Sequence, residues 1–188
     1  MADAPSADEL ARVRGSARCL ADAVTIERAV DRMAQSITEK LSQADPLLLT
    51  VMNGGLVPAA MLLRRLDFPL QVDYTHLTRY GLRTTGGELR WVKRPPESVR
   101  GRTVLVVDDL LDHGITLDAI VEACHDLGAA EVLTAVLITK QVEQRAGLRS
   151  TDFSALSLPD EYLFGYGMDY KTYLRNAPGI FAVDGDHA

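Results

Sequence analysis

Continuous apolar runs are the feature of this sequence that most restricts its fold. LLLTVM (47–52), VLVV (104–107) and EVLTAVLITK (131–140) are apolar at nearly every position, not at every second one. A strand of this composition is buried on both faces, which is typical of a parallel sheet covered by helices on each side. The runs therefore predict the inner strands of an α/β sheet, and they require helices to cover them.

Segments with helical spacing lie before and between these runs. In the first of them, apolar side chains recur every three or four positions and share one face. They are Ile26, Val30, Met33, Ile37 and Leu41. We expect Thr25 to cap this helix, and we expect further helices over 58–66 and 117–127, the last ending at Gly128. Strands and helices in alternation predict an α/β fold with a largely parallel central sheet.

The rest of the chain adds two strands and no second domain. Residues 70–80 alternate apolar and polar side chains, which predicts a strand, and after a loop residues 89–94 are expected to pair as another. Residues 1–16 are polar and alanine-rich, and we expect a loosely ordered or weakly helical lead-in. Because the chain has 188 residues and no repeat or linker, residues 1–188 are expected to form a single domain.

Composition argues against several classes of function. Twenty lysines and arginines against 26 aspartates and glutamates give a net charge of -6, whereas proteins that coat nucleic acid are usually basic. We see no apolar stretch long enough for a signal peptide or a membrane span. Cys19 and Cys124 lie far apart and the histidines are scattered, so neither a disulfide nor a protein-built metal cage is expected. We therefore expect a cytoplasmic protein.

The segment VLVVDDLLDHGITL (104–117) places three carboxylates and a turn where a buried strand ends. Ligands of open α/β sheets bind beyond the carboxyl ends of the strands, and Asp108 and Asp109 lie at such an end. Asp112–Thr116 lead into a helix whose N–H groups and dipole favour an anion such as phosphate, and Gly114 allows a close approach. The carboxylates can hold sugar hydroxyls or hydrated Mg²⁺. The segment predicts a site for a phosphorylated sugar; the alternative is a solvent-facing loop with capping side chains.

Two families carry a comparable segment. VLVVDD is similar to the first strand of a response-regulator receiver domain, but such a domain would carry its third acid at the end of a later strand. The strand that ends at Lys140 has no acid there. The better match is the type I phosphoribosyltransferase family, because the segment resembles its motif for phosphoribosyl pyrophosphate (PRPP): apolar residues, two acids, then Asp-x-Gly-x-Thr. VLITK (136–140) and DEYLFGYGMDYKTYLRN (160–176) narrow the resemblance to the hypoxanthine-guanine phosphoribosyltransferases.

The resemblance extends over about residues 20–184 and implies a fold and a reaction. The fold would be a central, mostly parallel sheet flanked by helices, with a small hood built from the N- and C-terminal segments. The reaction would be purine salvage, in which the 5-phosphoribosyl group of PRPP moves to N9 of hypoxanthine or guanine. The products would be IMP or GMP and pyrophosphate, with Mg²⁺ as cofactor. The family also implies a homodimer or homotetramer.

The resemblance assigns the sugar and its phosphate to one segment. Asp108 and Asp109 would hold the ribose hydroxyls, directly or through Mg²⁺. The 5′-phosphate would lie in the turn formed by Asp112, His113, Gly114, Ile115 and Thr116. Asp112 would also act near the purine N7 as the general base or proton relay.

The purine contacts that the resemblance implies lie in the C-terminal part of the chain. Lys140 would donate to the 6-oxo group, and Tyr162 would stack on the ring. The backbone of Leu163 and the carboxylate of Asp169 would lie at the 2-position edge, with Asp169 also near the metal. Arg175 would reach the pyrophosphate.

Two further segments match the parts of the family that bind and cover pyrophosphate. In the loop MNGG, the backbone N–H groups of Asn53, Gly54 and Gly55 would bind it, although Asn53 stands where the family often has a basic residue. Residues 80–94 would form a mobile active-site loop with Tyr80 as the residue that covers the reacting centre.

A second class of function is a regulator with the same fold. Such a protein would bind PRPP or nucleotide, and in some cases nucleic acid, without turnover. The acidic chain and the intact purine-edge segment favour the enzyme, and no nucleic-acid or membrane partner is expected. Nucleotide formation from PRPP, Mg²⁺ and a purine distinguishes the two.

Overall fold

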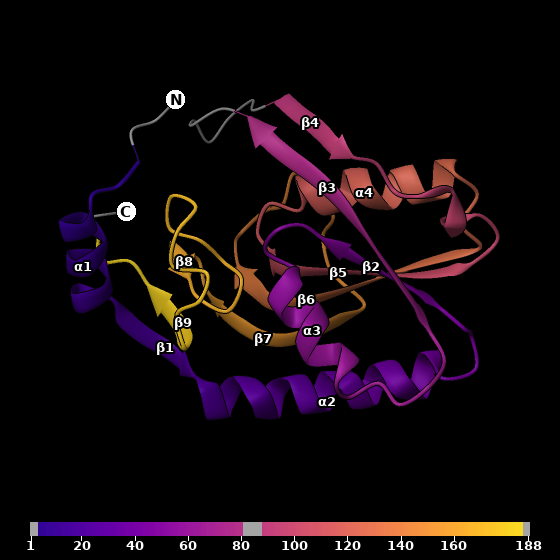
Figure 1. Ribbon diagram of the computed structural model, residues 1–188, viewed down its shortest axis with the longest axis horizontal. Coiled ribbons are helices and arrows are strands. Elements are labelled where there is room, and N and C mark those ends of the chain that lie inside the picture. The colour runs from indigo at the N-terminus through magenta and orange to yellow at the C-terminus, as the bar shows by residue number, and fades with distance from the viewer. Residues whose placement is uncertain (1–3, 81–87, 186–188) are drawn as a thin grey trace.

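The computed structural model describes residues 4–80 and 88–185, and its centre is a mixed, mostly parallel sheet. Within that part of the chain the sheet has six strands in the order β4-β3-β2-β5-β6-β7 (Figure 1). The strands are β2 (Leu47–Val51), β3 (Gln71–Tyr80), β4 (Glu88–Lys93), β5 (Thr103–Leu111), β6 (Glu131–Gln141) and β7 (Phe153–Pro159). All neighbours are parallel except β3 and β4, which pair antiparallel. The predicted α/β fold is confirmed.

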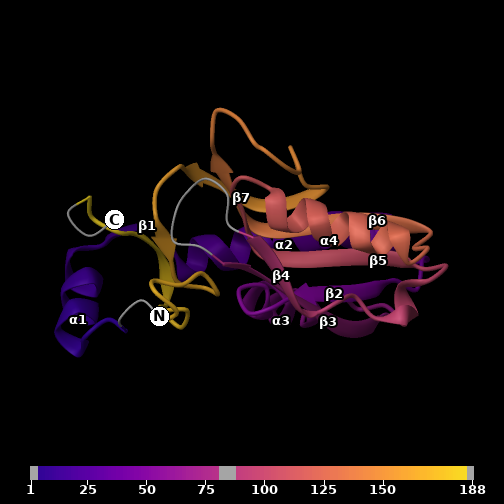
Figure 2. The ribbon, with the colours of Figure 1, turned by 90° about the horizontal axis from the view of Figure 1, so that it is seen from above.

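Helices cover both faces of this sheet, as the continuous apolar runs require. On one face, α2 (Ala23–Leu41) and α3 (Leu56–Leu63) pack on a cluster that includes Leu48 of β2. On the other, α4 (Ile115–Asp126) packs on a cluster that includes Leu47 and Leu49. Successive residues of β2 therefore pack in the clusters on opposite faces of the sheet, and the layers are visible from above in Figure 2. A short 3₁₀ helix, Glu97–Val99, precedes β5.

The helix boundaries differ from the predicted ones because caps, not apolar spacing, set them. The first residue of α2 is Ala23, and its cap is Asp22, whose Oδ1 accepts the Thr25 N–H at 2.8 Å. The prediction of Thr25 as the cap was wrong: this residue lies in the first turn and donates to the cap. The helix predicted at 58–66 begins at Leu56, directly after its Gly55 cap.

A smaller sheet forms the hood implied by the family resemblance. Its strands are β1 (Arg18–Asp22), β9 (Gly179–Ala182) and β8 (Leu163–Phe164), in that order and antiparallel. The lead-in expected to be loosely ordered or weakly helical contains a helix, α1 (Ala7–Ser16), which lies beside this sheet (Figure 1). The helix is capped by the Ser6 hydroxyl, which accepts the Glu9 N–H, and it buries Val13 against the hood.

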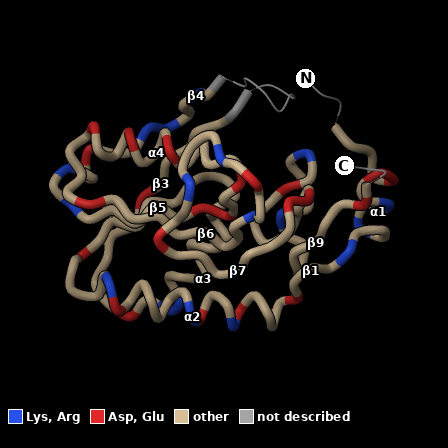
Figure 3. The backbone as a smooth tube through the Cα atoms, turned by 180° about the vertical axis from the view of Figure 1, so that it is seen from behind, with Lys and Arg blue, Asp and Glu red and all other residues tan. Residues whose placement is uncertain are grey.

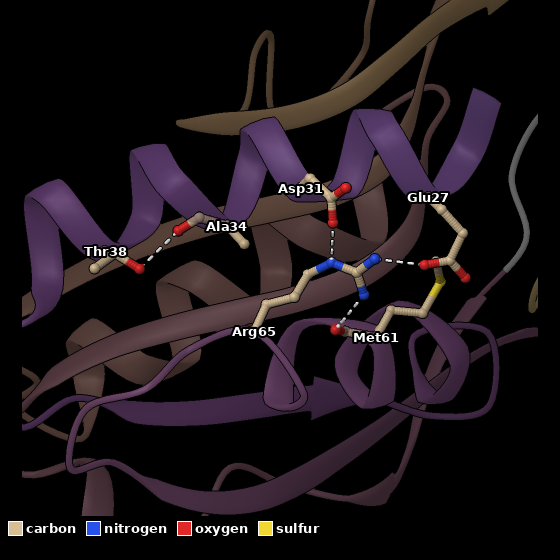
Figure 4. A network of polar contacts seen from close by, with 6 residues as sticks. All are labelled: Glu27, Asp31, Ala34, Thr38, Met61 and Arg65. Carbon is tan, nitrogen blue, oxygen red and sulfur yellow. Dashed lines mark hydrogen bonds and ion pairs between the residues drawn. The ribbon is translucent and has the colours of Figure 1, made fainter. Parts of the chain in front are cut away.

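Arg65 joins the two helices that cover the first face. Its Nε donates to Asp31 at 2.7 Å and its Nη1 to the Met61 carbonyl oxygen at 2.9 Å, while Nη2 contacts Glu27 (Figure 4). The Arg65 side chain is only 18% exposed, so these bonds replace much of the water that its cation has lost. The end of α3 is thereby held against α2.

The helix surfaces carry both signs of charge. Figure 3 shows acidic and basic positions interspersed along α2. Among the helices that the structure describes, none is long and apolar enough to cross a membrane.

Candidate active site

A cavity of about 670 Å³ opens beyond the carboxyl ends of β2 and β5. Its walls come from the turn after β2, from β3, from the end of β5, from the start of α4, and from the segment 169–175. The carboxyl ends of parallel strands meet at one edge of a sheet, which is where open α/β sheets bind their ligands. The cavity therefore lies where the sequence predicted a site.

Asp108, which is buried, and Asp109, which is half-buried, form a carboxylate pair at the end of β5. Asp108 is 8% exposed, and its Oδ1 accepts the Asp109 N–H at 2.9 Å. Burial and the neighbouring Asp109 charge raise the pKa of Asp108 well above its usual range. Burial also raises the pKa of Asp109, against the opposing effects of its hydrogen bond with Asp108 and the charge of Arg175. Two such carboxylates favour a cation or hydroxyl donors between them.

Glycines bring two other segments into contact with this pair. A Cβ on Gly54 would lie 1.9 Å from Asp109 Oδ2, so the turn after β2 can approach the carboxylate only without a side chain. Gly167, with φ of +109°, likewise lies too close to that turn to carry a side chain: an added Cβ would lie 2.2 Å from the Gly54 carbonyl oxygen. The turn after β2, the end of β5 and the C-terminal segment therefore meet at one point.

The turn between β5 and α4 has the form of an anion site. Asp112, His113, Gly114, Ile115 and Thr116 all line the cavity. Gly114 has φ of +78° and precedes the first helical residue, and a Cβ there would lie 2.2 Å from the Leu148 carbonyl oxygen. The first N–H groups of a helix have no partners within it, and the helix dipole favours negative charge at this end. The geometry suits a phosphate group.

Asp112 faces Lys140 across the strand ends. Lys140 is 8% exposed, and its Nζ lies 3.5 Å from Asp112 Oδ2 and 3.3 Å from Asp160 Oδ1. Asp112 Oδ1 is buried and has no hydrogen-bond partner among the described residues. A buried acceptor without a donor is costly, which is a reason to expect that a ligand supplies the missing proton.

Arg145 fixes the backbone beneath both of these side chains. Its Nε donates to the Asp112 carbonyl oxygen at 2.9 Å, and its Nη2 to the Lys140 carbonyl oxygen. Sequence analysis did not find Arg145, because a residue that binds main-chain oxygens leaves no motif.

The segment 169–175 contributes an ion pair to the cavity. Asp169 Oδ1 lies 2.6 Å from Arg175 Nη2, and Arg175 Nη1 donates to the Gly167 carbonyl oxygen at 2.6 Å. Asp169 Oδ2 accepts the Thr172 N–H, also at 2.6 Å. Both charged side chains face the Asp108–Asp109 pair.

Some predicted residues lie outside the cavity lining. Gly55 packs against the backbone, and its N–H donates to the Val51 carbonyl oxygen at 2.9 Å, so this group is already occupied. Leu163 is buried in β8, and Tyr162 is 39% exposed beside the hood. Tyr80 is the last residue of β3, but its side chain and residues 81–87 lie outside the described residues. Of the predicted 80–94 loop, Glu88–Lys93 forms β4.

Three polar residues of the cavity were missed. His76 and Thr78 lie on β3, and Thr172 lies in the C-terminal segment. His76 and Thr78 are two positions apart and so share one face of the strand. That periodicity was the available signal, but its use required knowing that β3 is parallel to β2 and ends at the same edge.

The comparisons with known proteins agree with this geometry. A model of the phosphoribosyl transferase domain matches residues 18–171. The chain belongs to this family. A hypoxanthine-guanine phosphoribosyltransferase of Bacillus subtilis is 31% identical over 82% of this chain and 86% of its own length. A hypoxanthine-guanine-xanthine phosphoribosyltransferase of Tritrichomonas foetus is 28% identical over 96% and 95%. A crystal structure of a hypoxanthine-guanine phosphoribosyltransferase of Bacillus anthracis, 25% identical, has a TM-score of 0.80 and covers 88% of this chain and 96% of its own.

The carboxylates of this phosphoribosyltransferase suit a magnesium ion held jointly with substrate. Within the described residues, no group of three or more His, Cys, Asp or Glu side chains could hold a metal ion. Mg²⁺ is usually bound by one or two carboxylates together with water and substrate phosphates, not by an all-protein cage. Asp108 and Asp109 are adjacent carboxylates with raised pKa values at the cavity, and they fit that manner of binding.

Proposed function

We propose that this phosphoribosyltransferase moves the 5-phosphoribosyl group of PRPP to N9 of hypoxanthine or guanine, giving IMP or GMP and pyrophosphate. The observation that carries the proposal is the position of Asp112. It belongs to the anion-binding turn before α4, and its carboxylate lies 3.5 Å from the buried ammonium of Lys140. A ligand that uses both has a phosphate at one end and a hydrogen-bonding base at the other. The names of the relatives agree with that assignment.

The sugar end of the substrate is held by β5 and the turn that follows. The Asp112–Thr116 turn receives the 5′-phosphate, and Asp108 and Asp109 accept hydrogen bonds from the ribose hydroxyls. As the bond from C1′ to pyrophosphate breaks, positive charge develops on the ribose ring, and nearby carboxylates stabilise it. Asp108 and Asp109 would hold Mg²⁺ together with the substrate, with Asp169 near it, and the ion would supply charge neutralisation for the pyrophosphate.

The leaving group lies where three segments meet. The backbone of Asn53 and Gly54 borders the cavity from below Asp109, and Arg175 borders it from the other side. Arg175 supplies the positive charge that Asn53 lacks. In our proposal Tyr80 and the 80–94 segment exclude water from the reacting centre.

The purine end is defined by Asp112 and Lys140. Lys140 donates to the 6-oxo oxygen, and Asp112, with its unpartnered Oδ1, accepts or relays the purine proton at N7. Tyr162 stacks on the ring, and the Leu163 backbone borders the 2-position edge. We further propose that the enzyme works in the cytoplasm as a homodimer or homotetramer.

Turnover with different purines tests this proposal. An ammonium group can only donate, so it pairs with a 6-oxo group and not with the amino group of adenine. We expect nucleotide formation with hypoxanthine and guanine, and a kcat/KM for adenine lower by about 10³-fold or more. Lys140→Gln offers both a donor and an acceptor, so it should lose most 6-oxopurine activity and narrow the gap to adenine. Initial rates with each base, xanthine included, measure both.

Two results would contradict the proposal in different ways. Use of adenine as readily as hypoxanthine by the natural protein would remove the role of Lys140. Binding of PRPP without nucleotide formed from any purine would favour the regulator instead.

A further inference from the structure

Helix α1 precedes the residues that the family model matches, yet it packs directly on the hood. The matched residues begin at position 18, and α1 spans Ala7–Ser16. Val13 of this helix is 1% exposed and packs with the buried hood residues Phe164, Tyr170, Ala177 and Val183. Figures 1 and 2 show the helix beside the hood, away from the central sheet. Its position raises the question of what it contributes to the site.

Glu9 is the polar link between α1 and the C-terminal segment of the site. Its Oε1 accepts the Tyr170 hydroxyl at 2.9 Å and the Lys171 ammonium at 2.8 Å. Tyr170 is 2% exposed, whereas the Glu9 side chain is one quarter exposed. The hydrogen bonds from Lys171 and then Tyr170 lower the pKa of Glu9, so the carboxylate stays ionised over the neutral range. One carboxylate therefore binds two successive residues, and 161 positions of sequence separate Glu9 from Tyr170.

The segment that Glu9 contacts is a tight turn, in which the backbones of Tyr170 and Tyr173 exchange two hydrogen bonds of 2.9 Å. Lys171, Thr172 and Leu174 have φ of +47°, +74° and +62°, in the left-handed region that side chains disfavour. Such conformations persist only when surrounding contacts impose them. The same few residues orient the site, because Asp169 accepts the Thr172 N–H and pairs with Arg175. Contacts that fix Lys171 thus also fix the ion pair.

The contacts of Glu9 also extend to Tyr162, the residue proposed to stack on the purine. The Lys171 N–H donates to the Tyr162 hydroxyl at 3.4 Å, and the rings of Tyr162 and Tyr170 are 5.6 Å apart. Tyr162 therefore contacts both residues whose side chains bind Glu9, Tyr170 and Lys171.

We propose that Glu9 is a positioning residue for the purine side of the site, acting from α1 through Tyr170 and Lys171. It keeps the 169–175 segment in its left-handed conformation, and with it the Asp169–Arg175 pair and the Tyr162 ring. The proposal rests on the proposed function for its kinetic consequence, but the contact itself is independent of it.

The test compares Glu9→Gln with Asp8→Asn in the full-length protein. Both changes neutralise a carboxylate in the first turn of α1 without changing its shape, and Asp8 is exposed. We expect Glu9→Gln to raise the KM for hypoxanthine roughly fivefold, with kcat changed less than about twofold and Tm equal to that of the Asp8→Asn control. Amide hydrogen exchange of a peptide that covers residues 169–175 should be faster in Glu9→Gln alone.

A double-variant cycle separates the ion pair from general loosening. Lys171→Met should raise KM as Glu9→Gln does, and the double variant should be no worse than the worse single change, because both remove one interaction. Effects that add would overturn the proposal. So would unchanged exchange in Glu9→Gln, or faster exchange with an unchanged KM. If the natural protein makes no nucleotide, the proposed function fails, while the exchange comparison still decides whether Glu9 holds the segment.

Discussion

The two glycines after β2 should respond in opposite ways to a single added methyl group. At Gly54 the new Cβ would meet the Asp109 carboxylate, with Oδ2 at 1.9 Å and Cγ at 2.3 Å. At Gly55 it would meet main-chain atoms, the carbonyl oxygens of Val107 at 2.5 Å and Val51 at 2.6 Å. A side chain can rotate away, but strand backbone cannot. Gly54→Ala should therefore displace a functional group, and Gly55→Ala should strain the fold.

The magnitudes follow from that difference. Forcing a methyl group into packed backbone costs about 1–3 kcal/mol, which for a domain of this size lowers Tm by roughly 3–10 °C in Gly55→Ala. Gly54→Ala should keep its Tm within about 2 °C, because Asp109 yields, yet its kcat/KM for PRPP should fall at least about tenfold.

Thermal unfolding and initial rates at varied PRPP measure the two effects on the same preparations. Rates are expressed per folded protein, so that loss of material is not mistaken for loss of function. The reasoning would be refuted by a Gly54→Ala protein that is destabilised as much as Gly55→Ala and retains full kcat/KM. That outcome would mean that Asp109 is held rigidly and that the turn, not the carboxylate, gives way.

Two further substitutions examine the carboxylates of β5 and its turn. The pKa of Asp108 is raised on folding, so its ionised form reduces stability above the folded pKa, and this penalty disappears as the pH falls through it. Asp108→Asn should therefore raise Tm at neutral pH by about 2–4 °C while abolishing turnover. In thermal scans at acidic pH this gain in Tm should shrink. A lower Tm at neutral pH than that of the natural protein would contradict the reasoning. Asp112→Asn keeps the shape of the turn but cannot take a proton, so kcat should fall by roughly 10²-fold with little change in KM for PRPP. An unchanged kcat in steady-state assays would leave Asp112 as part of the phosphate turn only.

The parts of the fold that the sequence predicts are those whose signal is local. Strands β2, β5 and β6 are apolar at successive positions, and the apolar face of α2 repeats over five turns, so each can be found from its own residues. The hood strands β8 and β9 have two and four residues, too few for any periodicity. They are strands only through pairing with segments distant in sequence: β9 pairs with β1 and β8, and β8 pairs with β9.

The residues of the candidate site also divide into those with a local sequence signal and those without one. The Asp108–Thr116 residues are contiguous, so one motif contains them all. Glu9 binds a side chain 161 positions away, and Arg145 binds only main-chain oxygens, one of them 33 positions away. The need for glycine at position 54 is likewise a matter of distance to Asp109, which exists only in the folded chain.

The pairing of β1 with β9 has a consequence for the order in which the molecule is made. Arg18, near the start of the chain, aligns with Ala182, near its end, and Asp169 and Arg175 lie between the two hood strands β8 and β9. During synthesis the central sheet and the phosphate turn emerge and can fold while β1 still waits for its partner. Because such long-range pairing forms late, a nascent chain would hold the sugar-phosphate half of the site long before the half that carries Arg175. Catalytic competence would then arrive only after β9 has been synthesised.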